Sequence, residues 1–276
     1  MSVETLRSKL GRGDIVFSTM LFMTQNPRWI ASFRSLGFDA IFVDNEHAPY
    51  SRNETASLVA MVDALGMTPL VRIPAPSDIW VNMALDAGAH GILAPYCETV
   101  QQVREIVGAA TLRPVKGILR SEVTAGKAAL VDETATYLDK FNRKPYIMIG
   151  IESVPALTNL EEIVEIKGVD AIFIGPHDLT ISQGIPNQYD HPDYERIVQQ
   201  IVGSCQRTGI AVAIHTGDPQ AAARWAREGA RFVIFGSDTT ALAAGYRQGL
   251  STLKSMLDDE GDASVGATKM GIPEEA

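Results

Sequence analysis

Short apolar runs recur along the chain, and each follows a helix-like stretch that ends at a glycine. A glycine just past a helix end takes the left-handed conformation that closes the helix. The run that follows is too short for a helix and is rich in Ile, Val and Phe, so it predicts a strand buried on both faces and parallel to its neighbours. The six such units are LGFDAIFVD (Gly37), LGMTPLVRI (Gly66), AGAHGILAP (Gly88), KGVDAIFIG (Gly168), TGIAVAIH (Gly209) and EGARFVIFG (Gly229).

Two further apolar runs, 15–21 and 146–152, have a weaker helix signal before them and bring the predicted strands to eight. Helix start signals lie between the strands, where a capping side chain precedes a helical pattern, often with proline at its first position. They are Asn26-Pro27, Ser51, Ser77 and Asp218-Pro219. This alternation predicts an α/β fold, a closed (β/α)8 TIM barrel. An open doubly wound sheet is the alternative, but no G-x-G-x-x-G follows the first strand.

Two regions fall outside the repeat. Residues 113–145 form a long insertion between the fourth and fifth predicted strands, where a lid or a subunit contact is expected. Residues 239–257 predict a last amphipathic helix, with Asp238 as its expected cap. We therefore expect one barrel domain over 1–258 and a mobile acidic tail over 259–276.

Composition narrows the class of protein. The net charge of -9 argues against nucleic acid or an anionic membrane as the main partner. No apolar run approaches the roughly 20 residues of a membrane helix, and the first residues lack the apolar segment of a secretion signal. The two cysteines, Cys97 and Cys205, stand far apart and in no cysteine motif, so ordinary thiols in a cytoplasmic protein are expected.

Polar residues follow the predicted strands at their carboxyl ends, where barrels of this kind carry their active sites. Charged groups that follow apolar strands so regularly favour a functional site. They are the segment Asp44-Asn45-Glu46-His47, Arg72, Glu152, the segment Gly175-Pro176-His177-Asp178, His215, and the segment Gly236-Ser237-Asp238.

These residue types can be assembled into one chemistry. Glu152 and Asp178 follow adjacent strands, and two carboxylates with open positions suit a hard divalent cation such as Mg²⁺ or Mn²⁺. Arg72 offers a planar fork for a substrate carboxylate, and His47 is a candidate general base. No lysine ends a predicted strand, which disfavours a Schiff-base mechanism.

Each of these residues also has a purely structural interpretation. Asp44, Glu46 and Asp178 could cap the helices that follow them. Arg72 could be a buried partner of Asp44 or Glu46, and Glu152 could bridge strands. The remaining residues that could be structural or peripheral are His47, His177 and His215.

Six stretches of the chain carry a resemblance to a known family. They are VDNEHAP (43–49), LVRIP (70–74), LDAGAHGILAP (85–95), IGIES (149–153), VDAIFIGPHDL (169–179) and FGSDTTAL (235–242). Together they resemble the HpcH/HpaI aldolases, which are class II pyruvate-specific aldolases. The resemblance implies that Glu152 and Asp178 bind the metal, that His47 is the base, and that Arg72 holds the pyruvate carboxylate. It also implies that Asp44 and Asp86 support the histidine, Asp86 across a subunit boundary, and that Gly175, Pro176, His177 and Asp178 line the substrate site. A trimer of dimers that exchanges the helix 238–257 is the implied assembly.

The chain departs from the pattern of this family at three places. Gly150 stands where the family usually has a glutamine in the substrate site. The entrance stretch after the fourth strand is altered over 113–120, and His215 replaces an apolar or small residue.

The leading hypothesis is an aldolase that cleaves a 4-hydroxy-2-oxo acid to pyruvate and an aldehyde, with Mg²⁺ expected and Mn²⁺ or Co²⁺ as alternatives. A second keeps the site but decarboxylates an oxaloacetate-type acid, or adds the enolate to another acceptor as macrophomate synthase does. Gly150 points to this second hypothesis. Related lyases of acyl-CoA thioesters and a non-catalytic barrel are the further alternatives.

Overall fold

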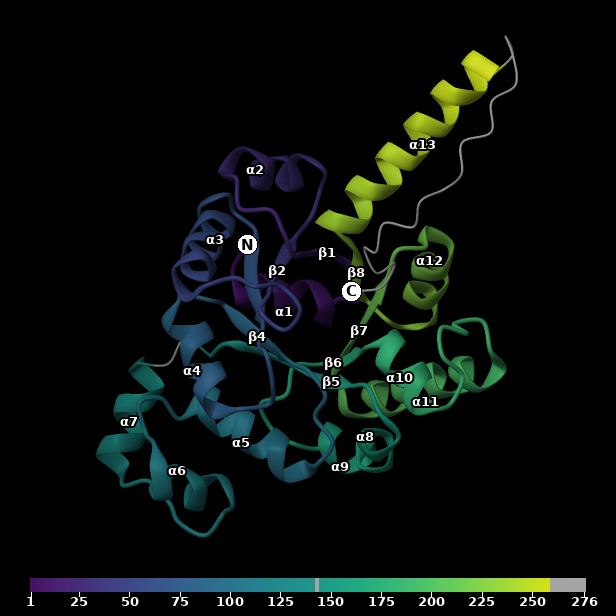
Figure 1. Ribbon diagram of the computed structural model, residues 1–276. Coiled ribbons are helices and arrows are strands. Elements are labelled where there is room, and N and C mark those ends of the chain that lie inside the picture. Colours follow the sequence, from purple (N-terminus) through teal and green to yellow (C-terminus); the bar gives the residue numbers. More distant parts are fainter. Residues whose placement is uncertain (142–143, 259–276) are drawn as a thin grey trace.

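The computed structural model describes residues 1–141 and 144–258, so the tail predicted over 259–276 lies outside the described residues. Eight parallel strands close into a barrel in sequence order, and helices surround it (Figure 1). The (β/α)8 prediction is therefore confirmed. The strands are β1 (Val16–Leu21), β2 (Ala40–Asp44), β3 (Thr68–Arg72), β4 (Gly91–Ala94), β5 (Tyr146–Ile151), β6 (Ala171–Ile174), β7 (Ala211–Thr216) and β8 (Phe232–Ser237).

The helices begin where their capping residues predicted. Asn26, Ser51, Ser77 and Asp218 each accept a hydrogen bond from the first turn of their helix, and Ser51 forms a full capping box with Glu54. The helices are α1 (Val3–Gly11), α2 (Pro27–Ser35), α3 (Arg52–Ala64), α4 (Asp78–Asp86), α5 (Val100–Thr111), α6 (Gly117–Thr124), α7 (Asp132–Phe141), α8 (Val154–Thr158), α9 (Leu160–Val164), α10 (Pro176–Ser182), α11 (Pro192–Thr208), α12 (Pro219–Glu228) and α13 (Asp238–Asp258).

Side chains alternate between two cores along each strand. Phe42, Leu70, Met148 and Phe173 belong to the core inside the barrel, whereas their neighbours pack between the strands and the helices. Because the period of a strand is two residues, the next inward positions after Phe42 and Leu70 are Asp44 and Arg72, and those after Met148 and Phe173 are Gly150 and Gly175. This alternation carries the side chains of the strand ends into the mouth of the barrel.

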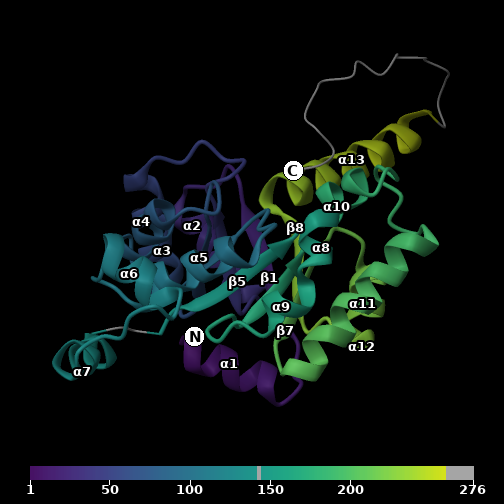
Figure 2. The same ribbon diagram turned by 90° about the horizontal axis from the view of Figure 1, so that it is seen from below.

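Helix α1 closes the opposite end of the barrel (Figure 2). Its Val3 and Leu6 are buried in the inner core, and its Arg7 donates to Asp170 at 2.7 and 2.8 Å. This helix was not predicted from the sequence, in which the segment is a polar N-terminus. Two buried apolar positions in a nine-residue helix are too weak a pattern to stand out.

Two regions stand away from the barrel wall. The insertion predicted over 113–145 contains α6 and α7, and α6 buries none of its residues. Helix α13 confirms the helix predicted over 239–257 and projects away from the barrel (Figure 1). Within the residues that the structure describes, no helix combines the length and the apolar character that a membrane span needs.

Candidate active site

Arg72, the last residue of β3, lies at the carboxyl end of that strand and is 6% exposed. Its Nε donates to Asp44, and its Nη1 lies 3.2 Å from Glu46. Its guanidinium carbon lies 5.9 Å from the centre of the Phe22 ring. The third nitrogen, Nη2, is buried and has no hydrogen-bond partner among the described residues. A buried donor without a partner is costly, so this atom indicates a place for an anionic ligand.

Asp44 organises the loop after β2. One carboxylate oxygen accepts the backbone N–H groups of Glu46 at 3.0 Å and His47 at 2.7 Å, while the other accepts from Arg72. Helix α3 is capped by Ser51 instead. The alternative interpretation of Asp44 and Glu46 as helix caps is therefore wrong, because the loop separates them from the helix and their carboxylates turn toward Arg72.

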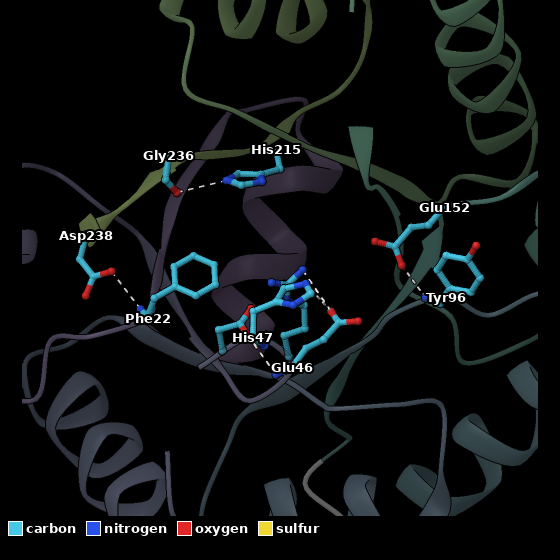
Figure 3. A network of polar contacts seen from close by, with 10 residues as sticks. Phe22, Glu46, His47, Tyr96, Glu152, His215, Gly236 and Asp238 are labelled. Atoms are coloured by element: carbon cyan, nitrogen blue, oxygen red, sulfur yellow. Dashed lines mark hydrogen bonds and ion pairs between the residues drawn. The ribbon is translucent and has the colours of Figure 1, made fainter. Parts of the chain in front are cut away.

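Glu46 and His47 form the exposed side of this cluster (Figure 3). Their Oε2 and Nε2 atoms lie 3.6 Å apart. Burial raises the pKa of Glu46 to about 8, and although Arg72 opposes the shift, the neighbouring Glu152, Asp44 and Asp178 add to it. Burial, and then the charge of Arg72, lower the pKa of His47. His47 is therefore a neutral imidazole near neutral pH, which is the form able to accept a proton.

Glu152 follows β5 and is only 2% exposed. Its carboxylate accepts the backbone N–H of Tyr96, whose φ of 50° is unusual for a residue with a side chain. Burial raises the pKa of Glu152 to about 7, and Asp178 is among the charges that add to the shift. Tyr96 was not singled out from the sequence, because no residue type there signals a left-handed backbone.

Two glycines leave room for this carboxylate. A Cβ added at Gly175 would collide with Glu152, and one at Gly150 would lie 2.6 Å from its Oε2. A larger side chain at position 150 would therefore displace Glu152 from the position that it takes here. Gly150 thus does more than omit a polar contact, because it sets where the neighbouring carboxylate lies.

Asp178 lies in the first turn of α10, directly after β6. The residue before this helix is Gly175, and no side chain caps it, so the interpretation of Asp178 as an N-cap is wrong. Because Pro176 begins the helix immediately after the strand, Asp178 already belongs to the helix and faces the cluster that contains Glu152 and Glu46. The Nδ1 of His177 lies 2.9 Å from the side-chain oxygen of Asn187, and the charge of His177 is among the causes that lower the pKa of His47.

Asp238 does not cap α13, contrary to the expectation from the sequence. Its carboxylate accepts the backbone N–H groups of Phe22 at 2.9 Å, Met23 at 3.0 Å and Thr24 at 2.7 Å. The side chain of Ser237 accepts from Thr240 in the first turn of α13. Asp238 thus holds the loop after β1, because a carboxylate can satisfy several loop amides at once. Figure 3 shows its contact with Phe22, whose ring lies beside Arg72.

Asp86 does not join the mouth of its own barrel. It lies at the end of α4 that leads into β4, is 69% exposed, and pairs with Arg113. Its expected action across a subunit boundary stays a prediction.

The two cysteines are buried, as expected for ordinary thiols. Both are fully buried, and burial raises the pKa of Cys205 to about 12 and that of Cys97 further. Neither thiol is activated as a nucleophile.

The fold and the mouth together define a (β/α)8-barrel enzyme in which buried carboxylates and one arginine meet at the carboxyl ends of the strands. Residues 18–244 match the model of the HpcH/HpaI aldolase/citrate lyase family. The 2-keto-3-deoxy-L-rhamnonate aldolase of Klebsiella pneumoniae is 30% identical over 240 residues, which cover 84% of this chain and 90% of the relative.

Solved structures agree with this match. An HpcH/HpaI aldolase from Desulfitobacterium hafniense has a TM-score of 0.78 and 29% identity, with 92% of this chain and 97% of that chain covered. Macrophomate synthase, at 19% identity and a TM-score of 0.73 over 94% of this chain and 90% of its own, shows the same fold. The chain belongs to the HpcH/HpaI aldolase/citrate lyase family and is a carbon–carbon lyase.

Proposed function

We propose that this enzyme cleaves a 4-hydroxy-2-oxo acid to pyruvate and an aldehyde, and also catalyses the reverse addition. The observation that carries the proposal is that Nη2 of Arg72 is buried beside Glu152 and Asp178 and has no hydrogen-bond partner among the described residues. A 2-oxo acid has a carboxylate for Arg72 and a neighbouring carbonyl oxygen for a cation at the two carboxylates. Relatives named 2-keto-3-deoxy-L-rhamnonate aldolases support this substrate class, since a 2-keto-3-deoxy sugar acid is a 4-hydroxy-2-oxo acid.

The residues of the mouth fit a divalent cation. Four carboxylates gather there, since Asp44, Glu152 and Asp178 all raise the pKa of Glu46, against the positive charge of Arg72. No cluster of three or more possible ligands occurs in 1–141 and 144–258. Glu152 and Asp178 would hold the cation, and water and substrate would fill its other positions. Mg²⁺ is the expected ion, and Mn²⁺ or Co²⁺ would also fit these oxygens.

The residues then divide the work of cleavage. Arg72 holds the substrate carboxylate, and Asp44 holds Arg72 and the His47 loop in place. His47, directly or through a water, removes the proton of the 4-hydroxyl group. The C3–C4 bond breaks, its electrons move into an enolate, and a proton added at C3 completes pyruvate. When bound, the cation supplies Lewis-acid stabilisation of the negative charge that develops on the substrate.

Exchange of the pyruvate methyl protons in D₂O tests this proposal without knowledge of the aldehyde. NMR should show exchange that requires Mg²⁺ or Mn²⁺ and that disappears in Glu152→Gln. The exposed Glu161, which pairs with Arg207 on the surface, offers Glu161→Gln as a matched control that should retain exchange. Absence of exchange with every cation would contradict pyruvate as the nucleophile.

Decarboxylation of an oxaloacetate-type acid is the second candidate, and Gly150 favours it. The site lacks a side chain from this position of β5, so nothing on that strand between the barrel core and Glu152 contacts an aldehyde group. Rapid cation-dependent release of CO₂ from oxaloacetate, with slow turnover of hydroxy-oxo acids, would support this alternative.

We also propose that α13 is covered by another copy of this chain, as the resemblance implies for a trimer of dimers. The helix projects from the barrel with an apolar stripe that includes Leu242, Tyr246, Leu250 and Leu253, each 47–66% exposed. Residues at this spacing lie on one face of a helix. Sedimentation analysis should find a hexamer in the wild type and smaller species in Leu250→Glu, whereas a wild-type monomer would contradict the proposal.

A further inference from the structure

The β8 strand is distorted at its carboxyl end, beside His215 of the neighbouring β7. Ser18 of β1 pairs with Ile234, but Met20 pairs with Ser237, so β8 contains one residue more than β1 over this stretch. Gly236 lies in this bulge with a φ of 55°, in the left-handed region that favours glycine. Bulges of this kind re-aim the groups of a strand, often beside active sites.

The bulge fixes the orientation of the His215 ring. The carbonyl oxygen of Gly236 lies 3.3 Å from His215 Nε2 and also accepts the hydroxyl of Thr19 at 3.2 Å. A carbonyl oxygen can only accept, so Nε2 carries the hydrogen of the imidazole. The other nitrogen, Nδ1, therefore presents a lone pair. Burial, and then the charge of Arg72, lower the pKa of His215 to about 4, which keeps the ring neutral.

The ring faces the mouth of the barrel. His215 stands two residues after Ala213, which belongs to the inner core, and its side chain is only partly covered. Figure 3 shows His215 and Gly236 on one side of the mouth and His47 with Glu46 on the other. Within the part of the chain that the structure describes, Nδ1 accepts no hydrogen bond, so its lone pair is left for a ligand or water.

The functional groups of the substrate limit which of its atoms can donate a hydrogen bond to Nδ1 of His215. The pyruvate half offers a carboxylate and a carbonyl group, and both are acceptors that a lone pair repels. The 4-hydroxyl group gives its proton to His47 in the proposed reaction. A further hydroxyl group, on the carbon chain that leaves as the aldehyde, is the donor that remains.

We infer that His215 is a specificity-determining residue whose Nδ1 accepts a hydrogen bond from a hydroxyl group on the aldehyde half of the substrate. The enzyme would therefore favour hydroxyaldehydes, as sugar acids release, over aldehydes with an apolar chain. This inference rests on the proposed function, because it assigns a place only to the second product of that reaction.

The test compares pyruvate addition to glycolaldehyde and to acetaldehyde, which differ by one hydroxyl group. The measured quantity is the ratio of the two kcat/KM values, determined for the wild type and three variants. His215→Leu removes both nitrogen positions. His215→Gln keeps a donor that can reach Gly236 but has no acceptor at the place of Nδ1, and His215→Asn keeps an oxygen there and loses the contact with Gly236.

The ratio should fall about five- to tenfold in His215→Leu and His215→Gln, as expected for one neutral hydrogen bond, and less in His215→Asn. The intrinsic reactivities of the two aldehydes cancel between proteins, and a purely structural loss would lower both rates together. An unchanged ratio in His215→Leu, with addition still measurable, would overturn the inference alone. A wild type that neither exchanges pyruvate methyl protons nor adds pyruvate to either aldehyde would overturn the proposed function and the inference with it.

Discussion

The two ends of the barrel both contain a partly or wholly buried arginine, but the arginines are satisfied to different degrees. At the end closed by α1, Arg7 donates to both oxygens of Asp170 and to the backbone carbonyl groups of Lys144 and Pro145. At the mouth, Arg72 forms ion pairs with Asp44 and Glu46, and its buried Nη2 has no hydrogen-bond partner in the described chain. Every nitrogen of the Arg7 guanidinium has a partner in the protein, whereas Nη2 of Arg72 has none among the described residues.

The carboxylates differ in the same way. Asp170 accepts a backbone N–H from Ile147 in addition to its two bonds from Arg7. Glu46 and Glu152 instead have their pKa raised, to about 8 and about 7, because burial and neighbouring carboxylates disfavour their charge. An uncompensated buried charge costs folding free energy. We therefore attribute the charged residues of the mouth to ligand binding and those of the closed end to stability of the fold.

The largest test of this difference is Glu152→Gln. We expect the lyase rate to fall about a thousandfold or more, which corresponds to about 4 kcal/mol in the barrier, because a cation loses a charged ligand. The free energy of unfolding, measured in urea with a chelator present, should stay equal or rise, because a buried charge is removed. A less stable variant would show instead that the mouth supports the fold.

Arginine-to-lysine substitutions at the two ends give a matched pair. Arg72→Lys should lower kcat/KM about a hundredfold, because an ammonium group cannot hold Asp44 and offer a planar fork to a carboxylate together. Arg7→Lys should leave kcat/KM unchanged and lower only the melting temperature. Equal losses of activity in the two variants would remove the distinction between the ends.

The contrast between the ends was only half visible in the sequence. The glycine-and-strand repeat predicted six of the strands, two weaker apolar runs predicted the other two, and separate start signals predicted four helix caps, because all of these depend on local chemistry. The two-residue period of a strand places Asp44, Arg72, Glu152 and His215 in the mouth once the barrel is known. Helix α1 was missed, because its burial comes from closing the barrel rather than from its own pattern.

The details of the site depend on contacts between distant segments. The sequence does not show that Tyr96 takes a left-handed backbone to reach Glu152, or that Asp238 holds the loop after β1. The bulge at Gly236 is likewise a matter of register between β1 and β8. Each of these features depends on contacts between segments that are distant in the sequence, and no residue type indicates it.

The third test concerns the closed end. Asp170→Asn removes the charge that pairs with Arg7 in a site where the aspartate side chain is 16% exposed and the arginine 33%. We expect the free energy of unfolding to fall by about 2 kcal/mol, because Arg7 keeps its charge without its partner. Activity per folded molecule should not change. A variant with wild-type stability and lower activity would reverse the roles of the two ends.

The smallest effect is a pH dependence that belongs to the mouth alone. An unfolded glutamate loses its proton near pH 4.5, whereas the folded Glu46 holds its proton up to about pH 8. Its stabilising contribution is therefore full below pH 4.5 and is lost as the pH rises through 8. Below pH 6.5 the lowered pKa values of His47 and His215 act in the opposite direction, since those side chains favour folding as the pH rises.

The window from pH 6.5 to 8 isolates the carboxylates. In urea unfolding with a chelator, the free energy of unfolding of the wild type should fall by about 1 kcal/mol more across this window than that of Glu46→Gln. The subtraction removes shared groups that lie away from Glu46, such as the chain terminus, and keeps Glu46 together with its coupling to the nearby Glu152. If the free energy of unfolding changed equally with pH in both proteins, Arg72 would keep Glu46 ionised in the free enzyme. The mouth would then contain a stabilising ion pair like that of Arg7 and Asp170 at the closed end.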